Sequence, residues 1–246
     1  MGLFDRKFCD ICGAKIGLLG NRKLDDGNCC KDCAAKLSPW FTGRKKSTVE
    51  QIKDQLAYRE ANKQAVENFN TTKSLGSDYK LLIDEDAKKF CVSRTGRLAN
   101  ENTDILDYGM VTGCIFDIED SKDEITTKDA QGNTVSYRPP RYEYEYDFYV
   151  TIHVNHPYFD EMHFRINNES VRIESAYDPK PQNNSDYVRF NEMGIEIKNT
   201  VEAMRQGARD EVAAASAPRI AVKCPHCGAT TYPEGGRCEY CGGAVS

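Results

Sequence analysis

Four C-x-x-C pairs, two near each end of the chain, constrain the fold more than any other feature. Cysteine pairs at this spacing present two sulfurs on one side of a tight turn, and two such turns complete a tetrahedral metal site. The N-terminal pairs are Cys9/Cys12 and Cys30/Cys33, and the C-terminal pairs are Cys224/Cys227 and Cys238/Cys241. The sequence therefore predicts two structural Zn²⁺ sites, each with four thiolates and no open position for catalysis.

Free thiols or redox pairs are the alternative interpretation of these eight cysteines. A redox C-x-x-C is expected beside a thioredoxin-like βαβ pattern, which the sequence lacks. The beginning MGLFDRKFCD has no apolar signal segment, and no apolar run approaches the ~18 residues of a membrane span. We therefore expect a cytoplasmic protein whose cysteines bind metal instead of forming disulfides.

The residues around each pair distinguish the two sites. Gly228 and Gly242 follow the C-terminal pairs, so we expect two similar turns and a small zinc ribbon over residues 223–246. In residues 1–44, Gly13 follows the first pair, but helix formers follow Cys33, which predicts a treble-clef-like finger whose second pair begins a helix. Cys29 competes with Cys30 as a ligand. The C-x-x-C spacing favours Cys30 and leaves Cys29 to pack as a small hydrophobe.

The middle of the chain alternates in polarity like a half-buried sheet. From Tyr142 to Val154, apolar and polar residues alternate over thirteen positions, and Met162, Phe164 and Ile166 repeat the pattern. Further strands are expected at 79–84, 89–94, 111–119 and 171–175, with a two-residue hairpin turn at Gly132–Asn133. A helix over 187–206 would close this domain, spanning 73–207, and 208–222 reads as a linker.

A connecting helix is expected over 45–72, with Ser47 and Glu50 as its capping box. Its apolar spacing is only partly helical. The closing helix carries a clearer stripe of Phe190, Met193, Ile197, Val201 and Met204, although Gly194 inside it costs about 1 kcal/mol relative to alanine.

The cysteine pattern of the finger and the helix expected after it make residues 8–60 resemble a bacterial family catalogued as domain of unknown function 4428. The resemblance implies Cys9, Cys12, Cys30 and Cys33 as ligands and implies no activity. The middle region resembles a pleckstrin-homology-like or GRAM-like domain, which implies an antiparallel β-barrel capped by a C-terminal helix. The C-terminal segment is similar to zinc ribbons appended to many bacterial proteins. The expected fold class is therefore α+β.

The candidates for chemistry are few. His153, His163 and Glu161 could share a polar sheet face and bind a metal, although a wet face with polar residues is the simpler interpretation. Asp84, Glu85 and Asp86 read as a solvated turn, and His226 as an exposed spacer between ligands. No nucleophile has an obvious base beside it, so we expect no enzyme, and the absence of histidine before residue 153 excludes a His-dependent nuclease in the finger.

Charge separates the partners that such a protein could bind. Residues 1–72 hold 13 Lys and Arg against 9 Asp and Glu, and residues 73–207 hold 16 against 25. The acidic middle argues against a membrane partner, because anionic headgroups attract basic patches. A protein or peptide partner is the leading expectation. Nucleic acid is the alternative, through Arg44, Lys45 and Lys46 beside two aromatics, or through Tyr232 and Tyr240.

Overall fold

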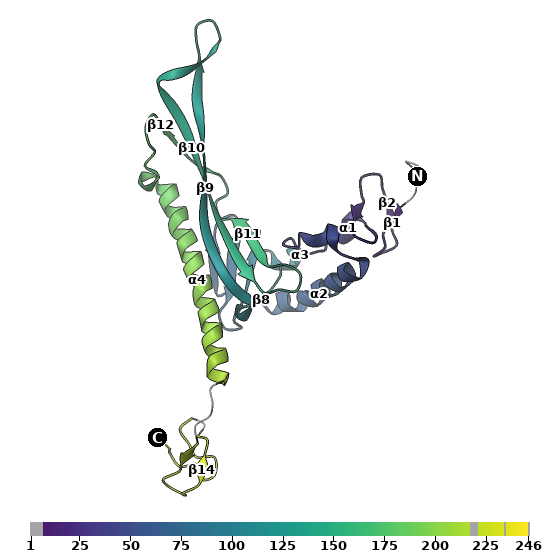
Figure 1. The fold of residues 1–246 in the computed structure, drawn as a ribbon, viewed down its shortest axis with the longest axis vertical. Helices are drawn as coiled ribbons and strands as arrows, with labels where there is room; N and C mark the ends of the chain where they lie inside the picture. The colour runs from purple at the N-terminus through teal and green to yellow at the C-terminus, as the bar shows by residue number, and fades with distance from the viewer. Residues whose placement is uncertain (1–6, 217–220, 234, 246) are drawn as a thin grey trace. The chain divides into compact units, whose positions relative to one another are not determined.

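A computed structural model describes residues 7–216, 221–233 and 235–245. The chain divides into two compact units, Met1–Gln206 and Gly207–Ser246. The first unit holds the finger, two sheets and most of the long C-terminal helix (Figure 1). The second holds the C-terminal cysteines and is described by itself below.

The finger consists of two very short hairpins and one helical turn. Its elements are β1 (Lys7–Phe8), β2 (Lys15–Ile16), β3 (Arg22–Lys23), β4 (Asn28–Cys29) and α1 (Lys31–Ala34). A tight turn containing Asp26 and Gly27 joins β3 to β4, since the Leu24 amide donates to the Gly27 carbonyl at 2.9 Å. A 3-10 turn, η1 (Gly43–Lys46), then leads to the next helix.

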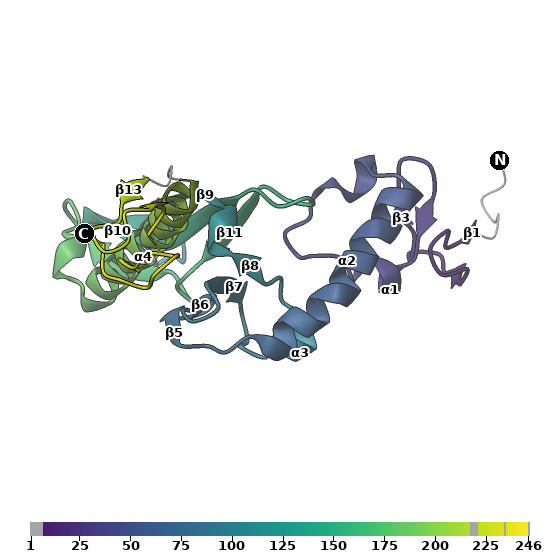
Figure 2. The same cartoon turned by 90° about the horizontal axis from the view of Figure 1, so that it is seen from below.

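Helix α2 (Val49–Asn68) contributes to two hydrophobic cores. Ile52 packs with the finger cysteines, and Val66 packs with Leu82 and Cys91 of the first sheet. Figure 2 shows α2 running from the finger toward the sheets. The expected cap is displaced by one residue: Thr48, not Ser47, accepts from the Gln51 amide, and the Gln51 side chain accepts from the Thr48 amide. Ser47 is used elsewhere, because its Oγ donates to the Gly43 carbonyl of the preceding 3-10 turn at 3.2 Å.

The first sheet is antiparallel in the order β5-β6-β7-β8. Its strands are β5 (Lys73–Gly76), β6 (Lys80–Asp84), β7 (Lys89–Ser93) and β8 (Leu106–Asp107). Both faces are covered, because Leu81 and Ile83 enter the main core while Leu82 faces α2. Asp84 is buried and accepts from the amides of Asn70 and Ala87, so this residue is a structural part of the turn and not a solvated one.

The second sheet is built around one long strand, β10 (Thr134–Val154). Strand β9 (Val111–Lys128) pairs along one edge, while β11 (Glu161–Arg165) and β12 (Val171–Ser175) share the other. The predicted alternation is confirmed: Phe148, Val150 and Ile152 are buried, as are Met162, Phe164 and Ile166. The β9–β10 turn is longer than the two residues expected, because the Asp129 amide donates to the Asn133 carbonyl across a five-residue loop.

The expected closed pleckstrin-homology-like barrel is not formed. The strands of the middle region, β5 to β12, make two separate four-stranded sheets, and no backbone ladder joins them. Strand β8 pairs with β7 over only two residues, and the chain then turns through η2 (Tyr108–Met110) into β9, which pairs with β10. The sheets instead meet through side chains in one shared core. The mixed α and β content of the prediction is confirmed.

Helix α4 (Ser185–Ser216) covers this core and is longer than the predicted 187–206. Its buried stripe includes Phe190, Ile197, Val201 and Met204, as expected. Gly194 is also buried, and a Cβ at this position would lie well under 3.0 Å from ring carbons of Phe116 on β9. The glycine therefore permits the close approach of helix and sheet. Two short helical elements, α3 (Leu98–Glu101) and η3 (Pro181–Asn183), complete the first unit.

Candidate metal centres

The first cysteine pair lies on a tight knuckle whose backbone fixes both sulfurs. The Gly13 amide donates to the Cys9 carbonyl at 2.8 Å, and the Cys9 amide donates to the Ala14 carbonyl at 2.9 Å. Gly13 has φ +74°, a left-handed conformation that glycine adopts without steric cost. The knuckle thus directs Cys9 and Cys12 toward the same point.

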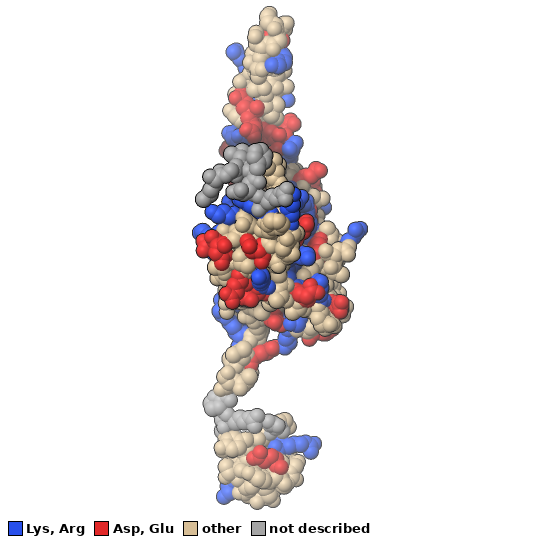
Figure 3. Space-filling model, turned by 90° about the vertical axis from the view of Figure 1, so that its right-hand side faces the viewer, with Lys and Arg blue, Asp and Glu red and all other residues tan. Residues whose placement is uncertain are grey.

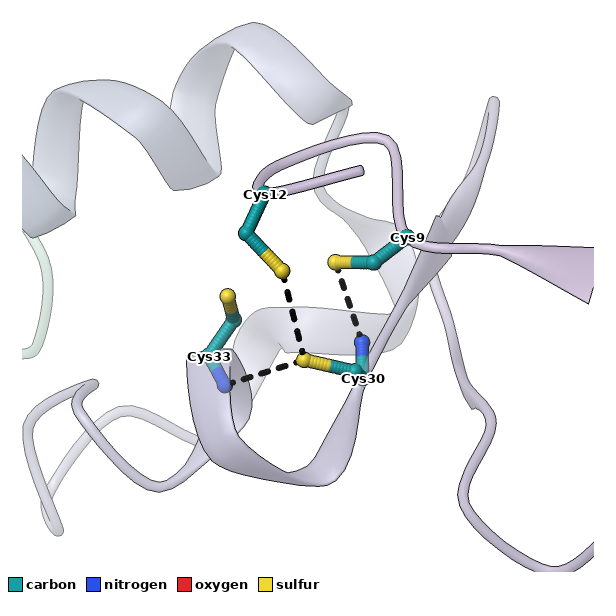
Figure 4. A group of neighbouring side chains, drawn as sticks. All are labelled: Cys9, Cys12, Cys30 and Cys33. Carbon is teal, nitrogen blue, oxygen red and sulfur yellow. Dashed lines mark hydrogen bonds between the residues drawn. The ribbon is translucent and has the colours of Figure 1, made fainter. Parts of the chain in front are cut away.

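The second pair is supplied by the beginning of α1, as predicted for a treble clef. Cys30 is the N-cap, and its Sγ accepts from the Cys33 amide at 3.4 Å. The Cys30 amide in turn donates to the Sγ of Cys9 at 3.2 Å (Figure 4). Hairpin, knuckle and helix are therefore joined through hydrogen bonds to the sulfurs themselves.

The spacing of the four sulfurs fits a tetrahedral metal ion. The Sγ atoms of Cys12 and Cys30 are 3.7 Å apart, and all four ligand atoms of the group lie within 4.8 Å of one another. Zn–S bonds of about 2.3 Å place tetrahedral sulfurs about 3.8 Å apart, whereas a disulfide needs about 2.05 Å. The cysteines are free thiols, and their arrangement suits metal coordination.

Hydrogen bonding also favours the anionic sulfur that a metal needs. Burial raises the pKa of Cys9, but amide donors from Cys12, Cys30 and Ile11 outweigh it and lower the pKa to about 6. Burial and the neighbouring thiols raise the pKa of Cys33 far above its ordinary value. Four thiolates this close repel one another, so a divalent cation is required for all four to ionise together.

Cys29 does not join the group. It is fully buried in the finger core, and its thiol donates to the Cys30 carbonyl at 3.4 Å. Burial raises the pKa of Cys29 to about 11, which keeps it neutral. The structure thus places Cys30 in the group and Cys29 in the hydrophobic core.

The C-terminal unit repeats the knuckle twice. The Gly228 amide donates to the Cys224 carbonyl at 2.9 Å, and the Gly242 amide donates to the Cys238 carbonyl at 2.8 Å. Both glycines are left-handed, at φ +72° and +70°. The flanking strands are β13 (Val222–Lys223) and β14 (Thr230–Thr231).

The sulfurs of this second group are spaced like those of the first. The Sγ atoms of Cys224 and Cys241 are 3.6 Å apart, and those of Cys227 and Cys238 are 3.7 Å apart. Burial raises the pKa of Cys238, but the amides of Cys241 and Tyr240 lower it to about 6. All eight predicted cysteines therefore fall into two groups of four that could each hold a metal ion.

The other sequence candidates are not brought together as a site. His163 Nδ1 hydrogen-bonds Thr151 Oγ1 at 2.9 Å, while His153 Nδ1 stands 4.0 Å from Glu161 Oε2 in a separate cross-strand pair. Within the described ranges, the groups able to hold a metal are the two cysteine clusters and do not include these residues. His226 is exposed, as expected for a spacer.

The basic cluster after the finger is partly structural. Arg44 Nη1 donates to the Lys23 carbonyl at 2.7 Å, while Lys45 and Lys46 are exposed. Figure 3 shows basic and acidic side chains interspersed on the visible face, with no broad area of one sign. In the C-terminal unit, Tyr232 and Tyr240 are 46% and 68% exposed.

A buried polar network fixes the finger to the sheets, and sequence reasoning missed it. The Arg59 guanidinium on α2 contacts the Asp104 carboxylate, whose other oxygen accepts from Ser38 Oγ at 2.8 Å. Asn62 adds bonds to the Thr103 carbonyl and the Ile105 amide. The spacing of positions 52, 55, 59, 62 and 66 is that of one face of a helix, and this spacing is visible in the sequence. Polar residues occupy three of the five positions, so the buried face could not be recognised from apolar residues alone.

Comparison with known proteins identifies one segment of the chain. Residues 7–55 match a family model described as a domain of unknown function, DUF4428, which spans about a fifth of the chain. The match includes the first four-cysteine group and the beginning of α2. It confirms the resemblance of the N-terminal region. No family match supports the resemblances of the middle region or the C-terminal segment, and neither the curated proteins nor the solved structures contain a match.

No helix in the described part of the chain has both the length and the apolarity required to cross a bilayer.

Proposed function

We propose that this chain is a zinc-binding, non-enzymatic adaptor that binds a protein or peptide partner. The observation that carries the proposal is that each metal group consists of four cysteine sulfurs at tetrahedral spacing. Four protein ligands saturate a zinc ion and leave no position for water or substrate. The metals would therefore stabilise small modules that are too short to bury a core of their own.

The attachment of the finger supports an interaction role for the first unit. Finger, α2 and first sheet are joined through Ser38, Arg59 and Asp104, whose side chains are buried. A buried polar junction of this kind would hold the finger and the sheets together as one composite surface for a partner. Preorganised surfaces lose less conformational entropy on binding.

Affinity capture from the native cell tests the proposal, with metal content measured on the same preparation. The full chain is compared with a chain ending at Ser216, each with and without nuclease. A nuclease-resistant protein partner, together with two zinc ions per chain, is expected. Loss of the partner on truncation would assign the contact to the C-terminal unit. Absence of zinc, or turnover of a substrate at either cluster, would refute the proposal.

Nucleic-acid binding is the second candidate, favoured by the exposure of Tyr232 and Tyr240 in the C-terminal unit. Exposed aromatic rings can stack on unpaired bases. Such binding should weaken steeply as salt rises, because neutralised phosphates release counterions. Capture that disappears with nuclease would favour this function over the adaptor.

A further inference from the structure

A cleft of about 650 Å³ lies where the segment after the finger meets the sheets. One wall is formed by Trp40 and Phe41, and the other by Tyr158 and Phe159 from the loop between β10 and β11, with Tyr79 also lining it. Its volume lies within the ~300–1,000 Å³ of typical ligand sites. Five aromatic rings from three distant parts of the sequence thus converge on one space.

The walls are held in place by contacts behind the cleft. The Trp40 ring lies 6.2 Å from the Tyr79 ring and 6.4 Å from that of Phe164, measured between centroids. On the opposite side, His156 stacks on Phe159 at 4.0 Å, and its Nε2 hydrogen-bonds the Tyr58 hydroxyl of α2 at 2.9 Å. The aromatic surfaces are therefore positioned before any ligand arrives.

The charge of the lining has one sign. Asp160 and Glu161 are exposed carboxylates of the lining, which contains neither lysine nor arginine. His163 also lines the cleft, and its Nδ1 is hydrogen-bonded to Thr151 Oγ1, while His153 outside the lining has its Nδ1 4.0 Å from Glu161 Oε2. The faces of aromatic rings are also electronegative, so rings and carboxylates together favour a cation.

Tyr79 already shows this preference within the protein. The Arg94 guanidinium lies 5.8 Å from the centroid of its ring and is paired with Asp78 at 3.1 Å. Arg94 lines the neighbouring cleft and not this one, so no arginine or lysine of the lining faces the carboxylates of Asp160 and Glu161; the basic group beside Glu161 is His153, 4.0 Å away. A cation from outside the chain is the group that would complete the site.

We propose that this cleft binds a lysine or arginine side chain of a partner peptide. The inference deepens the adaptor function proposed above and rests on it. The aliphatic stem of such a side chain would pack on Trp40 and Tyr158, while its charge would face Asp160 and Glu161. A neutral side chain would offer the two carboxylates no positive charge, and an acidic one would be repelled.

Trp40 provides a direct measurement, because it is the single tryptophan of the chain. The fluorescence of the zinc-loaded full chain is titrated with the capped peptides Gly-Gly-Lys-Gly-Gly and Gly-Gly-Arg-Gly-Gly. Matched peptides carry norleucine or glutamate at the central position. We expect a saturable change with the basic peptides and binding at least about tenfold weaker with norleucine, equivalent to about 1.4 kcal/mol.

Two double variants with the same change in net charge separate local recognition from general electrostatics. Asp160→Asn/Glu161→Gln should weaken the basic peptides about tenfold, and Glu192→Gln/Glu202→Gln, on the exposed side of α4, should leave them unchanged. Equal affinity for the lysine and norleucine peptides would overturn the proposal. Equal loss of affinity in both variants would also overturn it. So would the absence of a saturable response to either basic peptide up to 10 mM, because that concentration is about tenfold above a Kd of ~1 mM, which corresponds to ~4 kcal/mol of binding free energy.

Affinity capture with the same variants distinguishes this inference from the adaptor function. A partner lost with Asp160→Asn/Glu161→Gln and retained with Glu192→Gln/Glu202→Gln supports both. A partner captured equally by both variants overturns the cleft as its site and leaves the adaptor function standing. Peptide binding without any captured partner would support the cleft and refute the adaptor.

Discussion

Replacing Gly194 by alanine sets two opposing effects against each other in α4. Helix propensity alone favours alanine by about 1 kcal/mol. The alanine Cβ, however, would lie well under 3.0 Å from three ring carbons of Phe116, where carbon atoms at rest are about 3.5–4.0 Å apart. The ring stacks on buried Phe148 with centroids 6.4 Å apart, so it cannot retreat without disturbing the core.

We therefore expect Gly194→Ala to destabilise the protein. Overpacking a filled core costs about 1–3 kcal/mol. The tight approach to an aromatic ring places this case in the upper half of that range, and subtracting the propensity gain leaves a net loss of about 1–2 kcal/mol. The free energy of unfolding is measured by urea denaturation of the zinc-loaded protein, followed by Trp40 fluorescence and far-ultraviolet circular dichroism.

Two further variants make the result specific. Gly207→Ala, in the same helix with no atom within 4 Å of its Cβ position, should be neutral or stabilising by up to about 1 kcal/mol. Phe116→Leu should remove most of the clash, so that adding Gly194→Ala to it costs at least about 1 kcal/mol less than in the wild type. A Gly194→Ala protein as stable as the wild type would refute the reasoning.

Three other outcomes are expected. Asp104→Ala should lower the free energy of unfolding by about 3–5 kcal/mol, because it leaves the buried Arg59 charge without its carboxylate counter-charge; a loss below about 1 kcal/mol in the same urea assay would contradict this. Cys12→Ser should reduce bound zinc from two ions per chain to one by elemental analysis, while Cys29→Ala keeps both; equal zinc in the two variants would place the ligand set elsewhere. Burial lowers the pKa of His156, so the unfolded chain takes up a proton first as pH falls. The stability that buried, neutral His156 contributes is therefore complete above about pH 6.5 and is lost as the pH falls below that value. The variant His156→Gln should accordingly show a smaller fall of Tm between about pH 6.5 and pH 5. A variant with the slope of the wild type would show that other groups carry that fall.

The metal groups could be predicted from the sequence because their geometry is local. A C-x-x-C knuckle needs only a few residues and a glycine at positive φ, and the same hydrogen bonds recur at Cys9, Cys224 and Cys238. Strand faces were also predictable, since the alternation from Tyr142 to Val154 reflects a period that the backbone itself imposes. The buried stripe of α4 followed from its helical period for the same reason.

The pairing of the strands could not be predicted in this way. Alternation shows that a strand has a buried face but does not say which strand lies beside it, and the two open sheets replaced the expected barrel. The role of α2 was hidden as well, because Arg59 and Asn62 are polar residues made inward-facing by partners more than forty positions away. Only the folded chain supplies those partners.

The sequence by itself thus determined the two four-cysteine groups, the polarity of the strands and the apolar stripe of the last helix, all of which depend on residues a few positions apart. The tertiary structure decided the two-sheet arrangement, the ion pair that joins finger and sheet, the need for glycine opposite Phe116 and the aromatic cleft around Trp40. Each of these depends on contacts between distant segments, whose free energy exists only once the intervening chain has folded.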